Sequence, residues 1–259
     1  MKTFRFIGMA LFAALMCVNF AACSSSDDDP TEEKEEGGVV VSGKKLVKFV
    51  TDGGNWKETW ELKYDNKGQL IEATEKDGGT NEGSYTHQFA WGDDAVIFKS
   101  GYNNKNKIYT IKNGLLQSCD DGASYRYNQS NRIMSLNHGG FNGSAIATWS
   151  GDKLLAYSAD ETDFTLSYEQ NCNKGYSPLF LFLYIYDYTC EPLLLAHPEM
   201  LGMRTTQLPT SVTKNDDRYN MTSTLTYEFD KEGYITKITE KETDSNGATS
   251  TCTYTLTWE

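Results

Sequence analysis

Aromatic side chains alternate with polar ones in two segments of the chain, at a spacing that places them on one face of a strand. Trp56, Trp60 and Tyr64 share a face of the first segment, and His87 and Trp91 share a face of the second. On a surface protein such a face can stack against sugar rings, but in most sheets it lies in the core. We favour the core, and keep these five residues as the candidates for ligand binding.

Few residue patterns indicate catalysis. The three histidines, His87, His138 and His197, lie far apart, and His87 falls on an apolar strand face, where packed and hydrogen-bonded histidines are common. The chain has no nucleophile elbow, phosphate-binding loop or His-Glu-x-x-His motif. Acidic pairs at 120–121 and 216–217 keep glycoside hydrolysis open, although both adjoin turn residues. We predict no catalytic residue.

One segment matches part of a calcium-binding loop. Glu242, Asp244, Asn246 and Gly247 have the spacing of its first half, but the twelfth position is Thr253 and not the bidentate glutamate that the ion needs. A hairpin turn explains the same residues. We therefore expect neither a metal nor another cofactor.

Four cysteines follow Cys23 in the chain. They are Cys119, Cys172, Cys190 and Cys252, and no two stand at metal-ligand spacing. In an oxidising compartment they allow three pairings, between which the sequence does not choose. We prefer a disulfide between Cys172 and Cys190, because they bracket one short segment; free buried thiols are the alternative.

The start of the chain has the features of a secretory signal. Residues 1–22 combine two basic residues, an apolar run too short for a comfortable membrane span and small residues before a cut. Residues 19–23 resemble a bacterial lipobox, which implies that Cys23 is acylated and becomes the mature N-terminus. Residues 23–43 are predicted to form a disordered acidic tether. The Ser-Asp-Asp-Asp stretch resembles the surface-export signal of Bacteroidota lipoproteins; a plain spacer is the alternative.

The charge of the chain limits its partners. The formal net charge is −12, and segment 1–22 holds two positive charges and no negative one, so the mature chain carries −14. The tether accounts for −6 of this and the remaining residues for −8. So acidic a domain repels phosphate backbones, which excludes nucleic acid as a partner. We expect an outer-membrane lipoprotein that faces the cell surface and contacts the membrane through its lipid alone.

Alternation of apolar and polar residues dominates the rest of the chain. Segments 56–64, 85–91 and 251–258 each place apolar side chains on one face, and the last has a row of threonines on the other. This is the period of half-buried strands, and short turns rich in Asn, Asp and Gly separate them. The pattern predicts a mainly β domain over 44–259, folded as one large, curved antiparallel meander sheet.

A short unit recurs along this domain: an aromatic residue, an Asp or Asn, a turn, and then Leu or Ile. Near copies occupy 62–71 and 227–236, and weaker ones 125–133 and 148–154. Each copy is one hairpin, in which the aromatic ends a strand and the Asp or Asn starts the turn. The unit resembles the tyrosine-aspartate (YD/RHS-like) repeats of large bacterial shell proteins, and the layout resembles a Bacteroidota surface lipoprotein family of unknown function. That resemblance implies hairpins with one helical insertion and transfers no catalytic residue.

One apolar stretch interrupts the strands, and we predict a short helical insertion at about 178–203. It would hold a helix over 179–188, a turn aided by Pro192, and a second helix at 198–201 ended by Gly202. The insertion is expected to pack on the concave face of the sheet. A strand over its first half is the alternative.

These features favour a non-catalytic binding module, which would hold a glycan, a lipid-like ligand or a protein on its sheet. A structural envelope protein is the second hypothesis. A surface polysaccharide hydrolase with unrecognised carboxylates is the third.

Overall fold

The computed structural model describes residues 43–78, 83–137, 144–159, 162–168, 176–183, 190–205, 207–216 and 220–259. The predicted signal peptide, Cys23 and most of the tether lie outside these residues, so cleavage and lipidation stay predictions. No helix within the described ranges is long and apolar enough to cross a bilayer.

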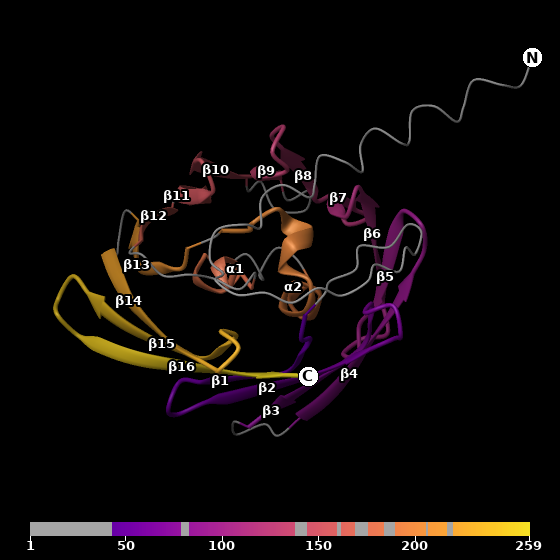
Figure 1. The fold of residues 1–259 in the computed structure, drawn as a ribbon, viewed down its shortest axis with the longest axis horizontal. Coiled ribbons are helices and arrows are strands. Elements are labelled where there is room, and N and C mark those ends of the chain that lie inside the picture. The colour runs from indigo at the N-terminus through magenta and orange to yellow at the C-terminus, as the bar shows by residue number, and fades with distance from the viewer. Residues whose placement is uncertain are drawn as a thin grey trace, which may run out of the picture. The chain divides into compact units, whose positions relative to one another are not determined.

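Sixteen antiparallel strands form a closed barrel, in which each strand pairs with its neighbour in the chain (Figure 1). The strands are β1 (Leu46–Asp52), β2 (Lys57–Tyr64), β3 (Leu70–Asp77), β4 (Gly83–Trp91), β5 (Ala95–Lys99), β6 (Asn106–Lys112), β7 (Leu115–Cys119), β8 (Ser124–Tyr127), β9 (Ile133–Asn137), β10 (Ser144–Ser150), β11 (Lys153–Ala159), β12 (Thr162–Tyr168), β13 (Pro209–Asn215), β14 (Asn220–Phe229), β15 (Ile235–Asp244) and β16 (Thr249–Trp258). The predictions of a mainly β fold and of meander connectivity are confirmed.

The prediction of an open, curved sheet is wrong, because the first and last strands pair. In this pairing Phe49 lies opposite Leu256, and Val50 lies opposite Thr255. Closure gives both edge strands a partner, so the backbone N–H and C=O groups that an open sheet would leave unpaired at its edges are hydrogen-bonded. The pairing joins residues about 200 positions apart, and no local pattern in the sequence reports it.

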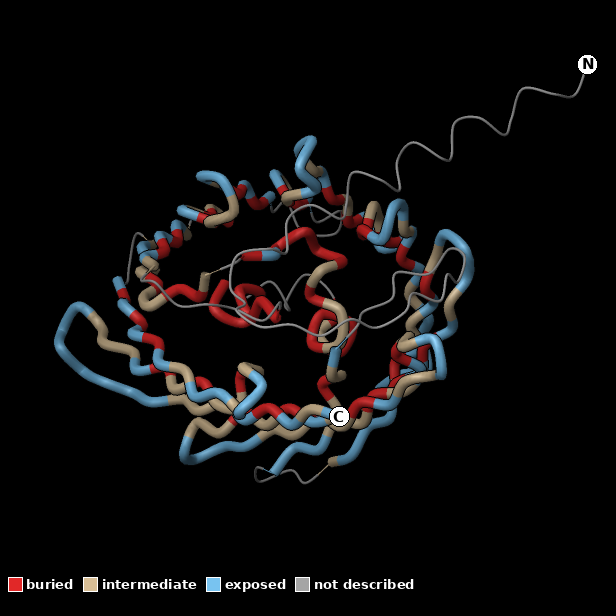
Figure 2. The backbone as a smooth tube through the Cα atoms, viewed as in Figure 1, coloured by how far each residue is buried: buried red, intermediate tan, exposed pale blue. Residues whose placement is uncertain are grey.

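Side chains alternate between the two faces of the barrel wall. Inward residues such as Phe49, Leu62 and Ile238 are buried, whereas the threonine row of β16 is largely exposed. Figure 2 shows this alternation along the strands, with buried residues concentrated on the segments inside the ring. The apolar core therefore lies within the barrel, and the outer face is mostly polar with single exposed apolar residues such as Ile71, Ile97 and Ile146.

The helical insertion fills the interior of the barrel. It contains α1 (Leu179–Phe182), α2 (Glu191–Ala196) and the 3-10 helix η2 (Pro198–Leu201), which the strands surround in Figure 1. Most of their apolar side chains are buried, and Leu193, Leu194 and Leu195 are fully so. The insertion thus packs inside a closed wall, not on an open concave sheet.

The helices differ in part from the prediction. Helix α1 begins at the expected Leu179 but ends at Phe182, and residues 184–188 of the predicted helix lie outside the described residues. Pro192 stands in the first turn of α2 and not between two helices. That position suits proline, because the first N–H groups of a helix have no intrahelical partner. Gly202 ends η2 at a φ of 68°, as predicted.

The recurring unit forms the turns that lead from even-numbered to odd-numbered strands. In the β2–β3 turn, Asp65 Oδ1 accepts hydrogen bonds from the backbone N–H groups of Lys67 and Gln69, both at 2.9 Å. Asp230 and Asn128 accept the equivalent pairs in their own turns. The predicted role of Asp or Asn as the start of the turn is confirmed in these three copies, whereas the copy at 148–154 has Ser150 at that position.

The aromatic residue of the unit has a second role, which we call the aromatic latch. At or near the end of seven of the eight even-numbered strands, a Tyr or Trp side chain donates a hydrogen bond to a backbone carbonyl near the start of the preceding strand. The pairs are Tyr64–Leu46, Trp91–Leu70, Tyr127–Leu116, Trp149–Ile133, Tyr168–Leu154, Tyr227–Pro209 and Trp258–Ile235. Strand β6 is the exception, with Ile111 near its end. The seven latches lie at one end of the barrel, which we call the latch end.

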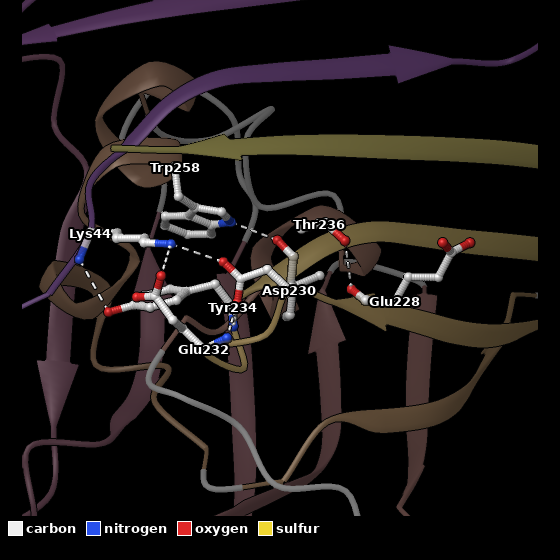
Figure 3. A network of polar contacts seen from close by, with 8 residues as sticks. Lys44, Glu228, Asp230, Glu232, Tyr234, Thr236 and Trp258 are labelled. Carbon is white, nitrogen blue, oxygen red and sulfur yellow. Dashed lines mark hydrogen bonds and ion pairs between the residues drawn. The ribbon is translucent and has the colours of Figure 1, made fainter.

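A polar network joins the two ends of the β domain at this same place (Figure 3). Lys44 Nζ lies 3.1 Å from Asp230 Oδ2 and 2.6 Å from Glu232 Oε1, and the backbone N–H of Lys44 donates to the hydroxyl of Tyr234. The indole of Trp258 donates to Ile235 O, which Figure 3 also shows. The residues before β1 and the end of β16 are therefore both tied to the β14–β15 turn.

Candidate functional site

A cavity of about 250 Å³ lies between the inner face of strands β2 to β6 and the start of α2. Its acidic lining residues are Glu58, Glu75 and Glu191, and its aromatic ones are Trp60, Phe98, Tyr102, Tyr109 and the imidazole of His87. The remaining lining is Ser100, Lys107, Cys190 and Pro192. At about 30 Å³ per water molecule, the space would hold roughly eight waters.

Strand register brings the polar residues of the cavity together. Trp60 of β2 lies opposite Glu75 of β3, and Glu58, two positions earlier, shares the inward face of Trp60. His87 enters from β4, opposite Ala73. Because alanine is small, it leaves room beside it for the imidazole and the indole, whose ring centroids lie 5.5 Å apart.

The imidazole of His87 is held in one orientation. It is 2% exposed, it stacks on Phe98 at 5.4 Å, and its Nδ1 accepts a hydrogen bond of 3.2 Å from the N–H of Gly101. In the neutral ring the proton is then on Nε2. That nitrogen lies 3.6 Å from Glu75 Oε2, too far for a hydrogen bond, and has no partner within the described part of the chain.

The indole N–H of Trp60 is a second buried donor without an acceptor. The side chain is 3% exposed, and its Nε1 has no hydrogen-bond partner among the residues that the structure describes. The Glu58 carboxylate is close enough for the indole to offset part of its pKa rise, but not in hydrogen-bonding geometry. An unpaired buried donor lowers the stability of the fold by about 1–3 kcal/mol, and this cavity contains two of them.

The carboxylates give the cavity an excess of negative charge. Burial, and then the charge of Glu75, raises the pKa of Glu58. The one lysine in the lining, Lys107, is engaged by Asp121, with 2.7 Å between Nζ and Oδ2. The cavity thus brings the carboxylates of Glu58 and Glu75 together, with Glu75 Oε2 also 3.6 Å from His87 Nε2.

Tyr102 lies at the mouth of the cavity. Its hydroxyl donates to Glu75 Oε2, and its ring packs against Tyr85 with centroids 4.3 Å apart. Burial and the bond to Glu75 raise the pKa of this phenol well above its usual value. Since the side chain is 54% exposed, the cavity reaches solvent beside it.

The five aromatic candidates from the sequence separate in space. Trp60 and His87 meet in the cavity. Tyr64 and Trp91 lie at the latch end, where both contact the edge of the His197 ring. Trp56 precedes β2, packs over Gly53 and is 46% exposed. Trp60 lies in the core and Tyr64 and Trp91 pack against it, at two depths of the barrel that have different surroundings.

His197 belongs to a partly buried pair at the latch end. Its Nδ1 lies 3.2 Å from Glu199 Oε1. Burial alone would raise the pKa of Glu199, but the hydrogen bond and charge of His197 outweigh it and lower the pKa. The pair joins α2 to η2 beneath the latches. His138 lies outside the described residues.

The other residues singled out in the sequence lie in turns. Asp120 accepts from the N–H of Ile108, Asp121 accepts from that of Ala123, and Asp217 lies outside the described residues. Asp244 accepts from the N–H groups of Asn246 and Ala248, as expected of a hairpin turn. No group of three possible metal ligands occurs in the described ranges.

The cysteines are thiols where the structure describes them. Cys119 and Cys190 are buried, Cys252 is partly buried, and all three are free. Burial raises the pKa of Cys190, a cavity residue, to about 12. Cys172 lies outside the described residues, so its pairing with Cys190 stays a prediction.

Sequence reasoning missed Glu58 and Glu75 as site residues. A signal was present: Glu58 stands on the inward face of its strand with Trp60 and Leu62. A carboxylate on an otherwise apolar face is either paired or functional. The meeting with His87 and Tyr102 had no such signal, since it depends on the register of four strands.

Comparison with known proteins agrees on the fold and adds no function. No protein-family model matches the chain, and no curated protein matches it. A solved porin-like protein from Bacteroides uniformis ATCC 8492 is similar over 83% of this chain and 96% of its own, with a TM-score of 0.62 and 17% identity. Another, from Bacteroides vulgatus ATCC 8482, covers 84% of this chain and 99% of its own, with a TM-score of 0.58 and 12% identity. The chain therefore has the fold of these porin-like barrels.

Proposed function

We propose that this chain is a cell-envelope protein whose plugged barrel binds a small polar ligand in the cavity beside α2. The observation that carries the proposal is the meeting of two donors that lack a partner among the described residues, Trp60 Nε1 and His87 Nε2, with the carboxylates of Glu58 and Glu75. A ligand that brings oxygen acceptors into this space would pair the two donors, and its own donors would add hydrogen bonds to Glu58 and to Glu75, which already accepts one from Tyr102. These groups favour a small polar molecule over a lipid-like ligand or a protein.

We further propose that the barrel itself lies in water. Most exposed positions on its longest strands are polar, among them Thr222, Thr224, Lys241, Thr251 and Thr255, and Phe229 at the end of β14 is an apolar exception. The inward neighbours Leu225, Ile238 and Leu256 are buried. Transmembrane barrels have the reverse polarity, with an apolar band outside and a polar lumen. This supports attachment to the outer membrane through a lipid on Cys23 alone. A membrane fraction that retains a Cys23→Ala variant as firmly as the parent chain would contradict it.

A glycoside hydrolase is the second candidate function. Glu58 and Glu75 come from neighbouring strands into one cavity, and the raised pKa of Glu58 suits a general acid. The test is turnover of aryl glycosides. Hydrolysis lost in both Glu58→Gln and Glu75→Gln would favour the enzyme, whereas tight binding without turnover favours the binding module.

The direct test of binding uses the mature chain with Cys23→Ser, which removes the lipid site. A screen of sugars, polyols and small amines by calorimetry should give a ligand whose affinity falls about 10-fold, or about 1.4 kcal/mol, in Trp60→Phe. This change keeps an aromatic ring and removes the indole N–H.

Trp149→Phe is the matched control. It also removes an indole N–H, but that group belongs to a latch and donates to Ile133 O. The control should leave the affinity unchanged. A folded chain that binds nothing in the screen, or an equal loss of affinity in both variants, would rule out this cavity as the binding site.

A further inference from the structure

We infer that the ligand of this cavity is a small hydroxylated amine, of the class of sugars with a free amino group. Its ammonium group would lie against Glu58 and Glu75, and its hydroxyl oxygens would accept from Trp60 Nε1 and His87 Nε2. This inference rests on the proposed function and specifies the ligand for the same site.

The charge of the cavity calls for a cation. Glu58 and Glu75 share the space and repel each other, and burial, followed by the charge of Glu75, raises the pKa of Glu58. Lys107 is already engaged by Asp121. An ammonium group would relieve this repulsion in a site of low dielectric constant, whereas a phosphate or carboxylate on the ligand would add to it.

The donors call for oxygen acceptors on the same molecule. Trp60 Nε1 can only donate, and His87 Nε2 is the protonated nitrogen of its ring, because Nδ1 accepts from Gly101. A simple alkylammonium ion carries no acceptor and would leave both donors unpaired. A hydroxyl group can accept from either donor and still donate to a carboxylate.

The aromatic lining suits the body of such a ligand. Trp60, Phe98 and Tyr109 border the cavity, and their faces attract both cations and the C–H faces of sugar rings. A volume of about 250 Å³ fits one ring with its substituents and excludes a long chain. A monosaccharide-sized amine satisfies the charge, the donors and the space together.

The test compares four probes on the mature Cys23→Ser chain by calorimetry: glucosamine, glucose, N-acetylglucosamine and glucose 6-phosphate. Glucosamine should bind at least about 10-fold more tightly than glucose or N-acetylglucosamine, and glucose 6-phosphate should bind most weakly. Raising the pH about two units above the pKa of the amine should reduce glucosamine to the affinity of glucose. The pH dependence of glucosamine binding is measured without a substitution, so it tests the inference even if a substitution disturbs folding.

Glu58→Gln should abolish the preference for glucosamine over glucose. The matched control is Glu72→Gln, since Glu72 lies on the neighbouring strand but pairs with Lys63 outside the cavity, and it should keep that preference. Neutral sugars that bind as tightly as glucosamine would overturn the inference and leave the proposed function standing. If none of these probes and no compound of the wider screen binds, both fail together.

Discussion

Strand β2 contains polar side-chain atoms in two different situations, hydrogen-bonded at the latch end and without a described partner at the cavity. At the latch end, the hydroxyl of Tyr64 donates to Leu46 O at 2.7 Å, and six other aromatic side chains repeat this arrangement around the barrel. Four residues earlier, the indole of Trp60 has no described acceptor. The latch end uses its polar atoms for stability, whereas the cavity end leaves donors and charges available. Substitutions should therefore lower stability at the first end and ligand affinity at the second.

The largest expected effect is the loss of a latch with its ring. Trp149→Ala removes an aromatic side chain packed against the core and its hydrogen bond to Ile133 O. We expect it to lower the free energy of unfolding by roughly 3 kcal/mol. Urea denaturation of this variant beside Trp56→Ala, whose ring is exposed and which should change stability by at most about 0.5 kcal/mol, provides the measurement. Equal losses would show that the latch adds nothing.

A smaller loss of stability is expected from a substitution where the helical insertion meets the latch end. Gly202 has a φ of 68°, and an added Cβ would lie 2.5 Å from Asn131 O. Gly202→Ala should therefore cost about 2 kcal/mol or more, from the left-handed backbone and the clash together.

Gly151→Ala separates these two causes. Gly151 has a similar φ of 61°, but nothing lies within 4 Å of its Cβ position. In thermal unfolding, the Tm of Gly202→Ala should be lower than the Tm of Gly151→Ala. The reverse order would mean that η2 does not dock against the β8–β9 turn.

A single latch hydrogen bond is expected to contribute about 1 kcal/mol. Tyr227→Phe keeps the ring but removes the hydroxyl that donates to Pro209 O at 2.8 Å, so it should lower stability by that amount and leave binding unchanged.

Tyr102→Phe removes the hydroxyl of a half-exposed side chain at the cavity mouth, and should weaken ligand binding with little loss of stability. Chemical denaturation should show the larger loss of stability in Tyr227→Phe, and calorimetry should show the larger loss of ligand affinity in Tyr102→Phe. The opposite result for both variants would contradict the proposed difference between the two ends.

The smallest effect is a gain in stability at the cavity end. The pKa of Glu58 is raised in the folded chain, so folding favours its protonated form, and this residue costs stability as the pH rises above its unfolded pKa. Glu58→Gln should raise Tm by about 2 °C at pH 7, and by less at pH 4. Scanning calorimetry at both pH values provides the measurement; a variant that is less stable at pH 7 would show that the carboxylate is stabilised by a partner.

Local features of this fold could be predicted from the sequence, and long-range ones could not. The turns at Asp65 and Asp230 were predictable, because each aspartate binds backbone groups two and four residues ahead. The closure of β1 on β16 was not, since it joins residues about 200 apart. The same applies to the cavity. Trp60 and His87 were candidates on their own, but only the register of β2, β3 and β4 brings them together with Glu58 and Glu75.

The missing latch on β6 marks a seam in the wall. Next to it, β7 and β8 are joined by one opposed pair, Ser118 and Ser124, and by the latch from Tyr127 to Leu116 O, whereas β14 and β15 have nine opposed pairs. Separating β7 from β8 therefore breaks the fewest interstrand bonds, so local opening is cheapest there. Because β6 also lines the cavity through Lys107 and Tyr109, brief breathing of this seam would give the enclosed space a second route to solvent, apart from the mouth beside Tyr102.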